Sequence, residues 1–131
     1  MGIRDGGSAF FAAMVAFTCH RELHRGADGA MTGFAYPEML VEVCNTFFGG
    51  RSEDAEDVFD IYLPLVRHEQ QIGVGLGIRK EILRRRGAIK SAAVRVPGPR
   101  LDNDDLEELE RLIRRLERWL SARHSRPGVA A

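Results

Sequence analysis

The chain has 131 residues, of which 44% are hydrophobic, and it carries 19 basic and 19 acidic side chains. This length argues for one domain and excludes a complete α/β barrel, which needs at least about 200 residues. A net charge near zero excludes nucleic-acid binding that depends on bulk positive charge, and the composition is that of a globular chain rather than a disordered one.

The most apolar stretch runs from Ala9 to Cys19. It is shorter than the roughly 20 residues of a membrane span. Asp5 precedes it and no small-residue cleavage pattern comes after it, which argues against a signal peptide. We therefore expect a buried helix, with Ser8 as its N-cap and Gly26 as its stop, in a soluble protein.

Residues 25–50 have the pattern of a strand followed by a helix. A turn over 26–29 leads into a short apolar piece, Ala30 to Thr32, and after a loop Pro37 suits the first turn of a helix. Apolar residues then recur at helical spacing up to Gly49: Met39, Leu40, Val43, Cys44 and Phe47. A lone interior strand would leave backbone groups unpaired. Either this piece is a loop, or its partners lie on another chain or are absent.

A third helix is predicted from Ser52, because its first turns are acidic and its apolar residues keep helical spacing. Pro64 falls inside this pattern and should kink the helix rather than end it. A fourth helix is predicted from Leu76 to Arg86, stopped by Gly87. The expected apolar face of the third helix consists of Ala55, Val58, Phe59, Tyr62, Leu63 and Val66.

The last predicted helix begins after Asp102, which we interpret as an N-cap. Trp119 should pack near the end of its apolar stripe, and the tail 123–131 should fray. Glu107 with Arg111 and Glu110 with Arg114 have the spacing of stabilising pairs. The stripe comprises Leu106, Leu109, Leu112, Ile113, Leu116 and Leu120.

Metal and disulfide signals are weak. Cys19 and Cys44 form no CxxC motif, and we expect reduced thiols. His20 and His24 could share a helical face as metal ligands do, but no third ligand is obvious at matching spacing. We therefore expect no metal and no cofactor.

Two further sequence patterns, a glycine-rich stretch and a run of cations, lie at the predicted fourth helix. The glycine-rich stretch 73–77 lacks the spacing of a phosphate loop and predicts a helix junction. A local run of cations favours a solvated helix face, with an anion or acidic-partner site as the alternative. The run comprises Arg79, Lys80, Arg84, Arg85, Arg86 and Lys90.

Several segments in order resemble one enzyme family. Gly26-Ala-Asp-Gly-Ala-Met-Thr-Gly33 looks like the last barrel strand of the dihydrodipicolinate synthase / N-acetylneuraminate lyase family. The helix opening at Pro37-Glu-Met-Leu40, Tyr62-Leu-Pro-Leu65, and Gly77-Ile-Arg-Lys-Glu-Ile-Leu-Arg-Arg-Arg-Gly87 are similar to the helical segments that come after that strand in the family. Arg95-Val-Pro97 and the final helix resemble the family's closing elements. The resemblance covers residues 22–120, and residues 1–20 fit it poorly.

The resemblance implies a mainly α chain that holds the last strand-helix unit and the C-terminal helices of an incomplete (β/α)8 barrel. We divide it into 1–25, an apolar N-terminal helix; 26–50, the last barrel unit; 51–122, a C-terminal helical region; and 123–131, a frayed tail. Family members are Schiff-base lyases and aldolases acting on pyruvate or another 2-oxo acid, without metal. The family uses the position of Met31, flanked by Gly29 and Thr32, to line the 2-oxo acid pocket.

The family's lysine lies on the sixth strand, so neither Lys80 nor Lys90, the two lysines of this chain, matches it. The first hypothesis is a truncated family member, inactive alone, cytoplasmic and homo-oligomeric, with no nucleic-acid or membrane partner and no catalytic residue of its own. The alternative is a non-catalytic helical interaction or oligomerisation module. A third hypothesis is an enzyme completed by a separately encoded barrel part.

Overall fold

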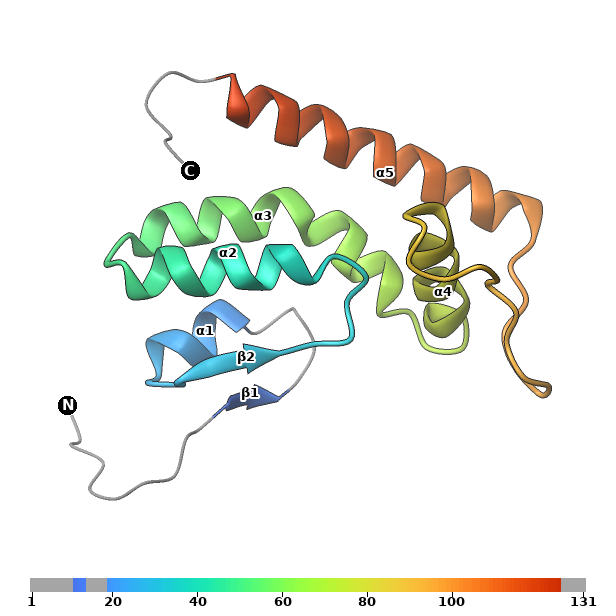
Figure 1. Ribbon diagram of the computed structural model, residues 1–131, viewed down its shortest axis with the longest axis horizontal. Helices are drawn as coiled ribbons and strands as arrows, with labels where there is room; N and C mark the ends of the chain where they lie inside the picture. Colours follow the sequence, from blue (N-terminus) through green and yellow to red (C-terminus); the bar gives the residue numbers. More distant parts are fainter. Residues whose placement is uncertain (1–10, 14–18, 126–131) are drawn as a thin grey trace.

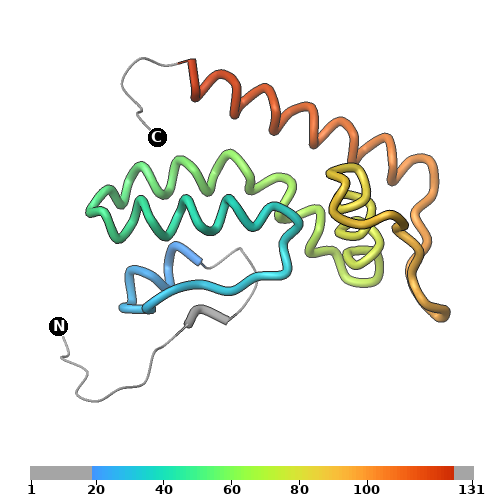
Figure 2. The backbone as a smooth tube through the Cα atoms, in the orientation of Figure 1, coloured from blue at the N-terminus to red at the C-terminus, as the bar shows by residue number. Residues whose placement is uncertain are grey.

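A computed structural model describes residues 11–13 and 19–125 of the chain, and Figures 1 and 2 show its arrangement. Within these ranges the order is β1 (Phe11–Ala13), α1 (Cys19–His24), β2 (Gly29–Met31), α2 (Pro37–Phe48), α3 (Ser52–Glu69), α4 (Gly75–Arg85) and α5 (Asn103–His124). The described part is mainly helical, and its two strands do not close a barrel. Ser8, the expected N-cap, lies outside these ranges.

The N-terminal unit is a strand, a helix and a second strand, with the two strands paired in parallel. Phe11 lies opposite Gly29, and Ala13 lies opposite Met31. The expected helix from Ala9 to Cys19 is therefore wrong at Phe11–Ala13, which is extended. The strand predicted at 30–32 is real, but the expectation that it lacks a partner within this chain is also wrong. Gly26, at φ 90°, ends α1 as predicted.

Helices α2 and α3 run side by side and carry most of the buried core (Figure 1). Pro37 occupies the first turn of α2, as predicted, and Gly49 caps its end. Pro64 lies inside α3, which continues to Glu69 and bends in its second half (Figure 1). The apolar face of α3 is as predicted except that Leu65, rather than Leu63, is buried.

Helix α4 packs on α3, and α5 lies along the opposite side of α3 from α2 (Figure 1). The predicted N-cap is confirmed, because Asp102 accepts from the backbone N–H of Asp105 and the Asp105 side chain accepts from that of Asp102. Leu109 and Leu116 are the buried members of the predicted stripe. Trp119 is 51% exposed, so its expected packing is wrong.

The end of α5 is more ordered than predicted. Residues 123 and 124 are helical, and the Arg123 guanidinium forms an ion pair with Glu42 on α2. Residues 126–131 lie outside the described part of the chain. On the exposed face, Arg114 pairs with Glu110 as predicted, while Arg111 pairs with Glu108 instead of Glu107.

The basic run on α4 is not simply a solvated face. The Lys80 ammonium donates to the Ala93 carbonyl. Arg84 and Arg85 pair with Glu81 on their own helix, and Arg86 pairs with Glu38 on α2. Lys80 and Arg86 therefore tie α4 and its end to neighbouring segments, whereas Arg84 and Arg85 pair mainly within the helix. None of the described helices combines the length and the apolar character needed to cross a membrane.

Candidate functional site at the carboxyl end of strand β2

The parallel pairing of β1 and β2 brings their carboxyl ends to one edge. Because Ala13 is level with Met31, both strands end at the same height. In α/β folds the loops after the carboxyl ends of parallel strands carry the functional residues. The loop over 32–36, which comes after β2, therefore occupies the position at which such folds carry a site.

Met31 is the last residue of β2, and its side chain is not packed into the core. It is 64% exposed, whereas Gly29 and Thr32 on either side are half-buried. A large apolar side chain left open at the end of a strand suits the wall of a ligand pocket. The position of Met31 is thus compatible with the predicted substrate-binding role.

The backbone after Met31 is held by hydrogen bonds. The Thr32 hydroxyl accepts from the Phe34 amide at 3.1 Å, which closes a tight turn. One residue further, the Ala35 amide donates to Oε2 of Glu69 at 3.0 Å. These contacts fix the course of the chain from β2 into α2.

Glu69 connects this loop to α4. Its side chain is completely buried, and its second oxygen accepts from Nε of Arg79 at 2.5 Å. Burial raises the pKa of the Glu69 carboxyl, and the hydrogen bonds from Arg79 and Ala35 counteract part of this rise. A paired and hydrogen-bonded carboxylate of this kind positions backbone rather than exchanging protons with a ligand.

Arg79 lies directly against the loop. A methyl group added at Gly33 would lie 2.6 Å from its Nη1 atom, so any side chain there would displace the guanidinium from its present position. The sequence places Arg79 in a basic run but gives no sign that it reaches Glu69, because the contact is between helices. Many sequences have a carboxylate at the end of one helix and a cation on the next helix. This pattern alone therefore does not predict the contact between Glu69 and Arg79.

Tyrosine side chains near the loop are core residues. Tyr36 and Tyr62 pack together with ring centroids 5.9 Å apart, and the Arg86 guanidinium lies 4.2 Å from the Tyr36 ring centroid. Burial raises the pKa of Tyr62 to about 12, and it also raises that of Tyr36. Both phenols therefore stay neutral at ordinary pH and are poor general bases.

The two lysines lie away from β2 in the chain and in the fold. Lys80 is on α4, in the right half of Figure 1, and Lys90 is in the loop after it, whereas β1 and β2 lie in the lower left part of the picture. The contact of Lys80 with the Ala93 carbonyl directs its ammonium toward that loop. The Lys80 ammonium is thus engaged with the loop after α4 and not with the loop after Met31.

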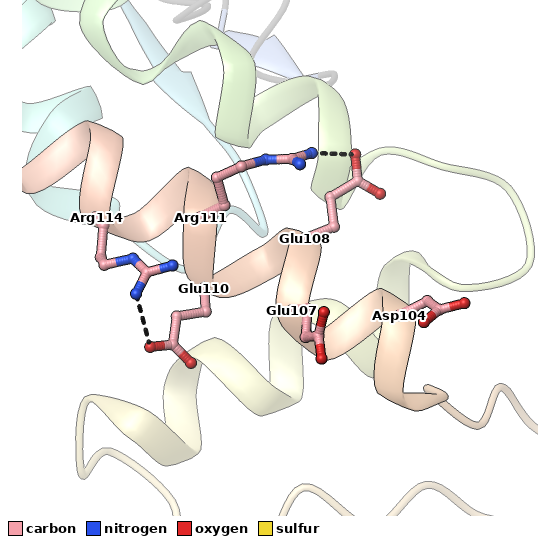
Figure 3. Close-up of a pocket in the computed structure, with 6 residues that line it drawn as sticks. All are labelled: Asp104, Glu107, Glu108, Glu110, Arg111 and Arg114. Atoms are coloured by element: carbon pink, nitrogen blue, oxygen red, sulfur yellow. Dashed lines mark ion pairs between the residues drawn. The ribbon is translucent and has the colours of Figure 1, made fainter.

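A surface hollow of about 600 Å³ lies along α5 (Figure 3). All the side chains that line it come from that helix, and they pair with one another through Arg111–Glu108 and Arg114–Glu110. A ligand site normally draws on several elements and encloses its ligand. This hollow is a charged helix face. Its lining consists of Asp104, Glu107, Glu108, Glu110, Arg111 and Arg114.

Three side chains with metal-ligating atoms converge elsewhere, between α1 and α3. Nε2 of His20 lies 2.9 Å from Nε2 of His24 and 2.9 Å from Oε1 of Glu56. Burial lowers the pKa of His20, against the opposing effect of Glu56. The sequence identified the two histidines but not Glu56, which only the packing of α3 on α1 brings to them.

No family model matches the chain, but a curated relative and a solved structure do. L-2-keto-3-deoxyarabonate dehydratase from Azospirillum brasilense is 36% identical over 124 residues, covering 89% of this chain and 40% of the relative. This match extends beyond residues 22–120, the stretch on which the resemblance rests.

A solved structure also matches most of this chain and a smaller part of its own length. Dihydrodipicolinate synthase from Rhodopseudomonas palustris superposes with a TM-score of 0.73 at 45% identity, covering 76% of this chain and 33% of that one. The chain thus spans 40% of the length of the curated relative and a third of the solved structure.

Proposed function

We infer a function from the premise that this chain corresponds to the C-terminal part of the dihydrodipicolinate synthase family. The chain would supply the last strand-helix unit and the supporting helices of a lyase or dehydratase that acts on a 2-oxo acid. On its own it would be catalytically silent, because the lysine that forms the Schiff base would come from a part of the fold not contained in these residues.

The observation that carries this proposal is the parallel pair β1–β2, which ends level at Met31. A strand-helix-strand unit with parallel strands is the repeating unit of a (β/α)8 barrel, in which sites lie at the carboxyl ends of the strands. The relative from Azospirillum brasilense is named for a dehydratase reaction on a 2-keto acid, which supports the same substrate class.

Met31 would contribute an apolar wall to the pocket in this proposal. Its side chain is 64% exposed where β2 ends, so it is free to contact a ligand there. The Glu69–Arg79 pair would act as support, because it holds the Ala35 amide and hence the loop after Met31. No described side chain in this loop is placed to act as a nucleophile or a general base.

A chimera tests the proposal. In the Rhodopseudomonas palustris enzyme, the matching C-terminal segment is replaced by residues 19–125 of this chain, and condensation activity is measured. We expect a folded, active chimera in which Met31→Asp raises KM for the 2-oxo acid at least about tenfold, since a carboxylate would repel the substrate carboxylate. Ile72→Asp, at a fully exposed apolar position of the connection between α3 and α4, is the control.

A folded chimera without activity would contradict the proposal, and so would a chimera in which the two aspartate variants behave alike.

A second function, self-association without catalysis, is favoured by one observation. Large apolar side chains stay exposed on α2 as well as at Met31, with Val41 at 59% and Phe48 at 56%. Sedimentation over a range of concentrations tests it, and a monomer at every concentration would contradict it.

A further inference from the structure

We propose that His20, His24 and Glu56 form a binding site for one divalent transition-metal ion of the Zn²⁺ class, which joins α1 to α3. This site is separate from the loop at Met31 and does not depend on the function proposed above. Two imidazoles and a carboxylate are a donor set that Zn²⁺ prefers. The site would take the metal through three protein ligands and leave a fourth position open.

The spacing of the donor atoms already suits a metal ion. The three ligating atoms lie within 4.8 Å of one another. The separations from Nε2 of His20 are 2.9 Å to His24 and 2.9 Å to Glu56, and that between His24 and Glu56 is 3.9 Å. Ligands placed tetrahedrally at about 2.05 Å from Zn²⁺ are about 3.3 Å apart, which lies between these values.

Hydrogen bonds alone do not satisfy the ligating atoms of this cluster well. A neutral imidazole nitrogen carries either one hydrogen or one lone pair. Nε2 of His20 has two close neighbours, and Nε2 of His24 also lies 3.0 Å from the Ser52 hydroxyl. One hydrogen or one lone pair shared between two such neighbours meets each of them with poorer alignment than it would meet one alone. A cation at the centre would accept all three lone pairs together.

The two helices present their ligands in matching rows. His20 and His24 are four residues apart on α1, and Ser52 and Glu56 are four residues apart on α3, so each pair shares one face. The Ser52 hydroxyl is placed to bond a water in the fourth position or to ligate directly. The Phe47 ring packs edge-on against both imidazoles, at centroid distances of 6.2 and 4.9 Å, and limits their rotation.

Metal binding would stabilise the position of α1 on α3. Helix α1 has only six residues and is marginal by itself. A metal bridge to Glu56 would anchor it to α3, and with it the connection between β1 and β2. Metal ligation by side chains from two elements adds binding free energy to the folded state only, because the unfolded chain does not hold the three ligands together.

The test uses the untagged 131-residue chain, stripped with EDTA and dialysed into chelator-free buffer. Zn²⁺ is titrated calorimetrically and thermal unfolding is followed with and without it, while Co²⁺ serves as a spectroscopic probe. We expect one Zn²⁺ per chain, a higher Tm with Zn²⁺, and the visible absorption of Co²⁺ in a low-symmetry four-coordinate site. Absence of saturable binding, or binding without a rise in Tm, would overturn the proposal.

Variants locate the ion. His24→Ala and Glu56→Gln should each weaken Zn²⁺ binding by roughly tenfold or more and remove the Co²⁺ spectrum. Both side chains are about half exposed, at 47% and 52%, so both variants should keep the wild-type circular dichroism. Glu53→Gln on the same helix and His124→Ala on α5 are the matched controls and should bind like the parent. Equal affinity in all four variants would show that the ion sits elsewhere and would overturn the proposal.

Discussion

Nε of Arg79 on α4 donates to Oε1 of Glu69 at the end of α3, across 2.5 Å. The other oxygen of Glu69 holds the Ala35 amide, which belongs to the loop after β2. A single buried carboxylate therefore connects the two helices to the loop that carries the candidate site. This arrangement makes the loop geometry depend on a residue far from it in sequence.

Removing the cation should be costly. Arg79→Ala leaves the Glu69 carboxylate buried without its charge partner, and we expect a loss of about 2–4 kcal/mol in the free energy of unfolding, somewhat less than for a fully buried pair. Urea unfolding measures it. Arg111→Ala, which breaks an exposed pair on α5, should cost less than about 0.5 kcal/mol. Similar losses for both variants would contradict the role given to Glu69.

Acid should weaken the fold through Glu81. The hydrogen bond from Arg84, with further help from Arg85, lowers the pKa of Glu81 from 4.5 to about 2. A carboxyl whose pKa is lower in the folded state contributes stability above about pH 5 and loses it as pH falls toward 2. Because both arginines are partly exposed, we expect only about 1–2 kcal/mol from this source.

Glu81→Gln should therefore be less stable than the parent at pH 7, and the difference should shrink as the pH approaches 2. Urea unfolding across this pH range measures it. Glu107→Gln, at an exposed position on α5, serves as the control and should leave the pH profile unchanged. A stability difference that stays constant with pH would show that Glu81 acts through packing rather than charge.

Two glycines at the start of α4 should respond in different ways to alanine. A Cβ at Gly75 would lie 2.3 Å from the backbone oxygen of Glu69, whereas one at Gly77 would meet the Leu101 side chain at 3.3 Å. Backbone cannot give way as a leucine methyl can, so we expect Gly75→Ala to cost about 2 kcal/mol or more. Gly77→Ala should be near neutral, because alanine also favours the helix. Thermal unfolding of both variants gives the comparison, and equal Tm values would argue against the close approach.

Cys19 should be the less reactive thiol. Burial, with a smaller effect of the neighbouring Cys44, raises its pKa to about 12, and only 2% of the residue is exposed. Since the thiolate is the nucleophile, alkylation near pH 8 should modify Cys44 first and Cys19 only as the chain unfolds. Peptide mass spectrometry over time measures this order. Modification of Cys19 ahead of Cys44 would contradict the described burial.

The helices from Pro37 onward could be predicted because their apolar spacing and caps agree. Pro37, Gly49, Gly87 and Asp102 mark boundaries through local backbone chemistry, which is visible in sequence. The strand at Phe11–Ala13 could not be predicted, because a short run without alternation fits a buried helix equally well. Its pairing with β2 removed the difficulty of an isolated strand.

The sites depended on contacts that no local pattern encodes. His20 and His24 have ligand spacing, but Glu56 joins them only when α3 packs on α1. Glu69 likewise has no sequence signal for burial, because its environment is made by α4 and the loop after β2. Trp119 shows the converse, since its place near an apolar stripe did not make it buried.

Borohydride trapping shows whether this chain forms a Schiff base with a 2-oxo acid by itself. The purified chain is incubated with pyruvate and sodium borohydride, and its intact mass is measured beside that of the Rhodopseudomonas palustris enzyme treated in the same way. We expect an unchanged mass for this chain and a reduced pyruvate adduct on the control enzyme. A stable adduct on Lys80 or Lys90 would contradict it.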